Sequence, residues 1–101
     1  MHPRDDLEQT INRIRYRVEG ATLLASDEYW DGHNHERHGR NTFLYRGPKG
    51  RYFAVHMTMW QGERDSIEAL DEDGAYELYE NLSEKEVDIE QAFPSVAIET
   101  A

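Results

Sequence analysis

The stretch that decides the fold is residues 42–60, TFLYRGPKGRYFAVHMTMW. Two runs of aromatic and aliphatic residues flank Gly47-Pro48-Lys49-Gly50, a combination that is typical of a tight turn between two strands. We therefore expect an antiparallel hairpin with strands at 42–46 and 51–60. Alternation along the second strand gives one of its faces to Phe53, Val55, Met57 and Met59.

The opposite face of the 51–60 strand is too aromatic to be fully solvated. It carries Tyr52, Ala54, His56, Thr58 and Trp60. Because large aromatic rings contribute strongly to stability when they are buried, we expect another element or a partner to cover this face. A helix downstream is the simplest cover.

A second hairpin is expected upstream. Residues 13–18 alternate polar and apolar side chains, which suits a strand with Ile14, Tyr16 and Val18 on its buried face. Glu19-Gly20 then offers a tight turn into a strand at 21–25, so that the first two strands pair with each other. A helix over residues 5–15 is the alternative for the start of this region. The polar residues 31–40 are expected to form a loop.

The main helix is expected at residues 72–82. Asp71 is placed to cap it, and Leu70 and Ala75 stand at the two positions of a hydrophobic staple. An apolar stripe at helical spacing consists of Ala75, Leu78, Tyr79 and Leu82. This stripe predicts which face of the helix packs against the sheet.

A short second helix is expected at residues 89–93. Asp88 and Gln91 are placed as a capping box, and Pro94 ends the helix. The fold class is therefore α+β, with a four-stranded antiparallel sheet of two hairpins followed by one main helix and a short C-terminal helix.

Length and composition predict one domain. The chain has 101 residues and is 38% hydrophobic, which suits a single core over 1–101, with residues 1–10 frayed and 95–101 as a tail. Without cysteine, disulfides, thiolate zinc sites and thiol catalysis are excluded. No run approaches the roughly 18 apolar residues that cross a bilayer, so we expect no membrane segment and a cytoplasmic protein.

The formal net charge of −10 is distributed unevenly. The balance is −3 over residues 1–32, +4 over 33–62 and −11 over 63–101. A negative protein repels a phosphate backbone, so broad nucleic-acid binding is disfavoured unless the central basic third forms its own face. The acidic third is either a solvated surface or a surface for a basic partner.

The candidate binding site is predicted from a short repeated pattern, Trp-x-Gly, which occurs as Trp30-Asp31-Gly32 and as Trp60-Gln61-Gly62. Each copy follows a strand-like run. In an up-and-down sheet the second and fourth strands run in the same direction, so both turns should emerge at the same end. That end is expected to collect these binding residues: Trp30, His33, His35, Glu36, Arg37, His38, Arg40, Trp60, Glu63, Arg64 and Asp65.

A metal-dependent or acid–base enzyme at the histidine loop is the first alternative. Imidazoles and a carboxylate are suitable zinc or nickel ligands, and His33, His35, Glu36 and His38 supply both. All of them lie on one loop, so we favour polar histidines that titrate near neutral pH, and predict neither a metal nor a cofactor. Glu63 and Asp65 are the candidate carboxylate pair. The sequence contains no phosphate loop, nucleophile elbow or kinase signature.

Nucleic-acid binding through the basic hairpin 37–51 is the second alternative. Its cations are interleaved with aromatic residues that could stack on single-stranded bases. The cations are Arg37, Arg40, Arg46, Lys49 and Arg51, and the aromatic residues are Phe43, Tyr45, Tyr52 and Phe53. We favour the structural interpretation, in which the rings fill the core and the arginines pair with the acidic third.

Five phrases of the chain resemble those of a family of short uncharacterised bacterial proteins that have no assigned activity. They are Trp30-Asp31-Gly32-His33-Asn34, Gly39-Arg40-Asn41-Thr42, Trp60-Gln61-Gly62-Glu63-Arg64-Asp65, Leu78-Tyr79-Glu80 and Ala92-Phe93-Pro94. The resemblance covers most of residues 20–95. It implies a natural single-domain protein and transfers no catalytic residue.

Together these observations predict a small acidic binding protein rather than an enzyme. Its expected partner is a macromolecule with a basic surface, which the acidic residues could attract by imitating the charge of a nucleic acid. Nucleic acid itself is the less favoured partner.

Overall fold

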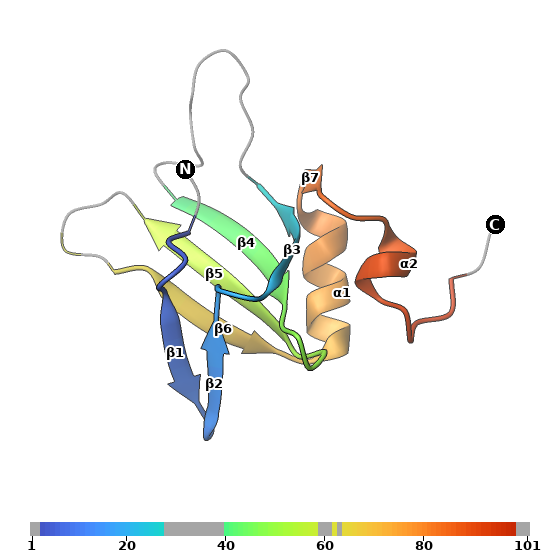
Figure 1. Cartoon of the computed structure of the whole chain (residues 1–101). Helices are drawn as coiled ribbons and strands as arrows, with labels where there is room; N and C mark the ends of the chain where they lie inside the picture. Colours follow the sequence, from blue (N-terminus) through green and yellow to red (C-terminus); the bar gives the residue numbers. More distant parts are fainter. Residues whose placement is uncertain (1–2, 28–39, 59–61, 63, 99–101) are drawn as a thin grey trace, which may run out of the picture.

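The centre of the protein is a five-stranded antiparallel sheet. The computed structural model describes residues 3–27, 40–58, 62 and 64–98. The strand order is β6-β5-β4-β3-β7, with every neighbouring pair antiparallel (Figure 1). The strands are β3 (Thr22–Ser26), β4 (Arg40–Arg46), β5 (Tyr52–Thr58), β6 (Ser66–Leu70) and β7 (Glu84–Lys85). The predicted hairpin is present as β4 and β5, and Met59 and Trp60, the end of its predicted second strand, lie outside the described residues.

The N-terminal residues form a separate two-stranded sheet. Strands β1 (Glu8–Ile11) and β2 (Ile14–Arg17) pair antiparallel, with Ile11 opposite Ile14. The two residues between them, Asn12 and Arg13, have φ values of 51° and 68°. Positive φ at both central residues is the geometry of the hairpin turn that matches strand twist. The alternative of a helix over residues 5–15 is therefore wrong.

The prediction of a four-stranded sheet built from two hairpins is also wrong. Strand β2 pairs with β1, and β3 pairs with β4 and β7, so β2 and β3 do not form a hairpin. The Glu19-Gly20 turn exists, and Ala21 N donates to Val18 O at 3.0 Å. This turn leads the chain from one layer into the next instead of reversing it within one sheet.

Helix α1 (Glu72–Asn81) begins as its sequence predicts. The Asp71 side chain accepts a hydrogen bond from Gly74 N at 2.7 Å, and Glu72 and Asp73 occupy the first turn, where the helix dipole favours negative charge. Ala75, Tyr79 and Leu82 are buried, whereas Leu78 is only half-buried. The apolar stripe therefore meets the sheet mainly through three of its four predicted residues.

The short strand β7 and helix α2 (Ile89–Ala92) complete the fold. The Asp88 side chain makes no capping hydrogen bond, so the predicted capping box does not form. Instead the segment is fixed by tyrosine hydroxyls: Tyr52 donates to Ala92 O at 2.8 Å, and Tyr79 donates to Val87 O. Neither α1 nor α2, the helices of the described chain, is long and apolar enough to cross a membrane.

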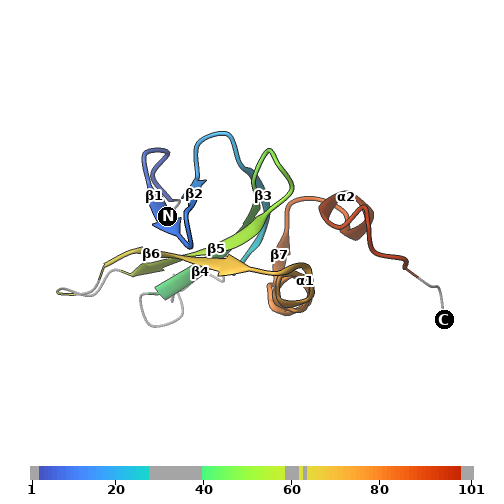
Figure 2. The ribbon, with the colours of Figure 1, turned by 90° about the horizontal axis from the view of Figure 1, so that it is seen from below.

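The five-stranded sheet has a hydrophobic core on each face. Figure 2 shows the β1–β2 hairpin on one side of the sheet and α1 and α2 beside the end of the sheet that carries β7. On one face Leu24, Leu44 and Tyr52 pack against α1 and the α2 segment. On the other face the core is covered by the β1–β2 hairpin and contains Tyr16, Val18, Phe43, Tyr45, Phe53, Val55, Met57 and Ile67. The helix side thus covers Tyr52 on the predicted aromatic face of β5, whereas His56 on the same face stays partly exposed and Trp60 lies outside the described residues.

A β-bulge in β3 increases the burial on the helix side. The register between β3 and β4 shifts between Leu23 and Ala25. A bulge breaks the strict alternation of side chains between the two faces. Leu24 and Ala25 consequently both belong to the helix-side core, while Leu23 packs against the hairpin-side core.

Candidate functional site

Most of the predicted binding residues lie outside the described chain. These are Trp30, His33, His35, Glu36, Arg37, His38, Trp60 and Glu63. Arg40 is the first residue of β4, Arg64 is exposed, and Asp65 is half-buried. Strands β3 and β5 are both antiparallel to β4 and so run in the same direction, as the prediction of a shared end required.

Buried and half-buried polar side chains fix the backbone at this end of the sheet. Asp65 Oδ1 accepts from Thr58 N at 3.0 Å, and Asp27 Oδ1 accepts from Thr42 N at 2.8 Å and from Asn41 Nδ2 at 3.2 Å. Asn41 is 2% exposed, and its Oδ1 has no hydrogen-bond donor among the described residues. In the described chain Asp65 thus has a structural role, because its carboxylate accepts a hydrogen bond from the backbone at the end of β5.

The aromatic residues of the basic hairpin are core residues. Phe43, Tyr45, Tyr52 and Phe53 are between 0% and 6% exposed. Tyr45 stacks on Phe53 with centroids 5.4 Å apart, and Tyr52 stacks on Phe93 at 5.0 Å. Rings held in this way present no free face to a nucleic-acid base, so the described hairpin lacks the stacking platform that single-strand binders use.

A basic pocket of about 500 Å³ lies between β2 and the β4–β5 turn. Its lining contains five cations and one carboxylate, Glu19. The cations are Arg13, Arg15, Arg17, Lys49 and Arg51. Its volume lies in the range of small-molecule sites, and parts of Ile14, Tyr16, Pro48 and Phe53 form its apolar wall.

Two tight turns position the cations of this pocket. Gly50 N donates to Gly47 O at 3.0 Å and Gly47 N donates to Arg51 O at 2.8 Å, which closes the turn that carries Lys49. Gly50 has a φ of 88°, a conformation that favours glycine. On the facing element, Arg13 itself occupies the left-handed turn position. Hydrogen bonds thus fix the backbone on the Lys49 side, and the β1–β2 ladder fixes it on the Arg13 side.

Among the described residues, most of these cations have no carboxylate partner. Arg15 Nε lies 3.6 Å from Glu8 Oε2, and both side chains are more than half exposed. For Arg13, Arg17, Lys49 and Arg51, no ion pair forms within 4.0 Å in the part of the chain that the structure describes. A chain with a net charge of −10 thus gathers unneutralised positive charge in one concave place.

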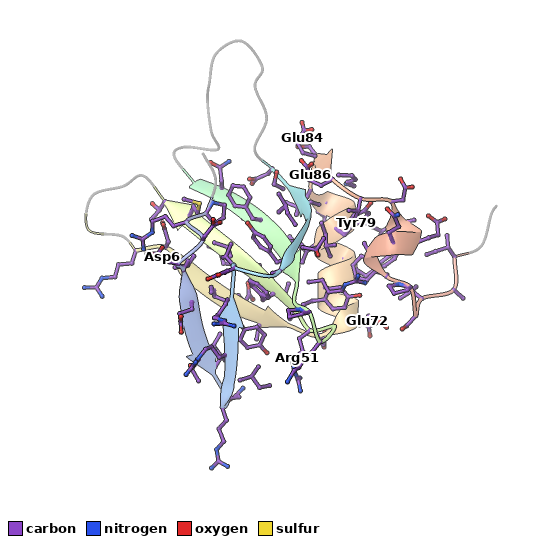
Figure 3. The ribbon with its side chains drawn as sticks, in the orientation of Figure 1. Asp6, Arg51, Glu72, Tyr79, Glu84 and Glu86 are labelled. Carbon is purple, nitrogen blue, oxygen red and sulfur yellow. The ribbon has the colours of Figure 1, made fainter. Side chains whose placement is uncertain are left out.

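The carboxylates gather instead on the helices and β7. Residues 71–98 carry nine acidic side chains and one lysine. Figure 3 shows Glu84 and Glu86 beside β7, far from Arg51, which lies close to the β4–β5 turn. A shallow pocket of about 400 Å³ on this side is lined by Tyr79, Val87 and Ile89 together with Glu86, Asp88 and Glu90. The lone cation Lys85 also lines it.

Lys85 is held by its own chain. Its Nζ donates to Leu82 O just beyond the end of α1 and lies 5.2 Å from the centre of the Tyr79 ring. A cation at the C-terminal end of a helix is stabilised by the carbonyl groups that have no partner within the helix. The described acids of this side form no ion pair within 4.0 Å of any described cation.

A hydroxyl–imidazole–carboxylate chain crosses the helix-side face at the end of the sheet away from Tyr52. His56 Nε2 lies 2.8 Å from Glu68 Oε1, and His56 Nδ1 lies 3.5 Å from Thr42 Oγ1. This order of groups can activate a hydroxyl, but His56 and Glu68 are 43% and 59% exposed and the hydroxyl distance is at the limit of a hydrogen bond. No group of three or more metal-ligating residues occurs in the described chain.

Comparisons with known proteins found no match among family models, curated proteins or solved structures. The residues and their geometry are therefore the basis for any assignment. Sequence reasoning missed the basic pocket because Arg13, Arg15 and Arg17 were interpreted as the polar face of a strand. Arginine at every second position of that strand was the signal that could have found it.

Proposed function

We propose that the protein is a non-enzymatic binding protein that modulates a macromolecular partner with a basic surface. The observation that carries this proposal is the separation of charge: nine carboxylates and one lysine over residues 71–98, on the side of the sheet opposite the β1–β2 hairpin. Such a surface attracts basic partners from a distance and repels nucleic acid.

The shallow pocket beside α2 favours the interpretation that the acidic side binds a specific partner over the interpretation that it is only a solvated surface. It combines carboxylates with the apolar groups of Val87, Ile89 and Tyr79. A lysine or arginine of a partner can bury its aliphatic stem against such groups while its charged end meets Glu86, Asp88 or Glu90. The Tyr79 ring already attracts the cation of Lys85 in this way.

Imitation of nucleic-acid charge is the finer part of the proposal. A partner whose basic groove normally holds phosphates would meet a rigid array of carboxylates on α1 and the α2 segment. Binding would then compete with nucleic acid, and the association rate would fall as salt screens the charges over about 8 Å at physiological ionic strength.

The test compares the full-length protein with a variant in which Glu77, Glu80, Glu86 and Glu90 are replaced by Gln. This variant keeps Asp71, Glu72 and Asp73, which stabilise the start of α1. A partner protein is first captured with the wild type and identified. The purified partner should then bind the variant at least about tenfold more weakly, mainly through a slower association rate.

The control replaces Asp5, Asp6, Glu8 and Glu19 by Gln, which removes the same charge near the N-terminal hairpin. Binding should then change by less than about threefold, because none of these side chains lines the acidic pocket beside α2. Equal losses in both variants, or tighter binding by the first variant, would show that the acidic side is not the binding surface.

A further inference from the structure

We infer that the basic pocket between β2 and the β4–β5 turn binds a small molecule that carries two or more phosphate groups. This site is separate from the acidic side on which the proposed function depends. Either proposal can therefore fail while the other stands.

The charge of the lining matches such a ligand. Five cations and Glu19 give the lining a formal charge of +4. A phosphate group carries about −1.5 to −2 near neutral pH, so one phosphate leaves the lining positive and two bring it close to neutrality. The acidic remainder of the molecule disfavours long polyanions, which would have to pass close to its carboxylates.

The chemistry of the lining selects phosphate among anions. Four of the five cations are arginines, whose planar guanidinium groups bind two phosphate oxygens at once. Lys49 adds a compact charge at the tip of the β4–β5 turn. Two separate elements supply these groups, so phosphates bound at each would draw the hairpin and the turn together.

The burial of the aromatic wall favours a small ligand over single-stranded nucleic acid. Tyr16 and Phe53 are 8% and 1% exposed, and they meet edge to face with centroids 5.6 Å apart. They shape the pocket without offering a stacking face to successive bases. A concave site of about 500 Å³ fits a compact molecule.

The free charge of the cations is a further argument. Like charges held close together repel each other, and Arg13, Arg17, Lys49 and Arg51 have no ion-pair partner within 4.0 Å in the described chain. Arg13 also occupies a turn position that costs a non-glycine residue roughly 1 kcal/mol. A bound polyanion relieves the repulsion that the fold alone leaves in place.

The test titrates the full-length protein calorimetrically with pyrophosphate, tripolyphosphate and inorganic phosphate in about 0.15 M salt. Pyrophosphate and tripolyphosphate should bind at least about tenfold more tightly than inorganic phosphate, because they bridge the two basic elements. Replacing Arg17 or Arg51 by Gln should weaken binding of pyrophosphate by about tenfold or more.

Two matched variants distinguish binding in the pocket from non-specific electrostatic attraction to the whole protein. Arg4→Gln removes an exposed cation that pairs with Asp6 outside the pocket and should change affinity by less than about twofold. Glu19→Gln removes the one carboxylate of the lining and should tighten binding. Melting temperatures of all variants confirm that each remains folded.

Three results would overturn the proposal. The first is no binding of pyrophosphate or tripolyphosphate at millimolar concentration in low salt. The second is an equal loss in Arg4→Gln and Arg51→Gln, which indicates non-specific attraction. The third is binding to single-stranded oligonucleotides that tightens with length and exceeds that of tripolyphosphate, which assigns the surface to nucleic acid.

Discussion

The two faces of the five-stranded sheet are covered in different ways. Helix α1 and the α2 segment cover one face with Tyr79, Leu82 and Phe93, and tyrosine hydroxyls connect the elements of this side. The β1–β2 hairpin covers the other face with side chains such as Tyr16, and its Gln9 side chain accepts a hydrogen bond from Ile67 N of the edge strand β6. Acidic side chains surround the helix face, and cations line the edge of the hairpin face.

This difference teaches where the molecule can respond to a ligand. A hairpin joined to the sheet mainly by apolar contacts can adjust its position at low cost, whereas the helix side is fixed by directional hydrogen bonds. A ligand in the basic pocket would therefore act on the more adjustable layer, and a partner on the acidic side would meet a rigid surface.

The largest expected effect comes from removing one large ring from each core. Phe53 on the hairpin side and Phe93 on the helix side are 1% and 0% exposed. Phe53→Ala and Phe93→Ala should each cost about 3–5 kcal/mol of unfolding free energy, measured by urea denaturation. A loss below about 1 kcal/mol for Phe53→Ala would show that the hairpin layer does not share the stability of the fold.

An intermediate effect is expected from the tyrosine hydroxyls of the helix side. Burial raises the pKa of Tyr52 above its ordinary value of 10.0, against a smaller opposite effect of Arg46, and burial also raises the pKa of Tyr79. A phenol with a raised pKa in the folded state contributes stability that is fully present below pH 10 and is lost as the pH rises through the folded pKa.

Thermal melts from pH 8 to about 11.5 measure this loss. The wild type should lose stability above pH 10, and Tyr52→Phe and Tyr79→Phe should each make the loss less steep. At neutral pH each substitution should cost about 1–3 kcal/mol, since Ala92 O or Val87 O loses its donor. Tyr76→Phe is the control, because the described contact of Tyr76 is made by its ring, and an identical alkaline slope in all variants would contradict the assignment.

The smallest effect is expected at the turn of the hairpin side and has the opposite sign. Arg13 has a φ of 68°, so Arg13→Gly should relieve strain and raise the unfolding free energy by up to about 1 kcal/mol. The same substitution should weaken binding of pyrophosphate by several-fold. Asn12→Gly, which changes no charge, is the control, and a destabilised Arg13→Gly would mean that its side chain contributes to packing.

The parts of the fold that the sequence predicted are those encoded within one short stretch. The β4–β5 hairpin follows from its turn residues and alternation, and α1 follows from Asp71 and its apolar stripe. The partner of β2 did not follow, because Asn12 and Arg13 do not carry the glycine that announces such a turn. Strand β7 has two residues, too few to show any periodicity.

The candidate site was less predictable than the fold. The direction of the strands predicts at which end of the sheet the candidate binding residues gather. Most of these residues lie outside the described chain, so their binding role stays a prediction. The basic pocket joins residues 13–19 to 47–53, which are distant in sequence and have no shared motif. Only the three-dimensional path of the chain brings them together.

The two outer strands of the sheet determine how the protein behaves at high concentration. Unpaired backbone groups along an outer strand can template the addition of another chain. On one side the outer strand β7 is only two residues long, and on the other Ile67 N of β6 already donates to Gln9 Oε1 at 3.1 Å. Both borders therefore offer little continuous backbone for stacking copies into fibrils, even though the central strands are rich in aromatic residues.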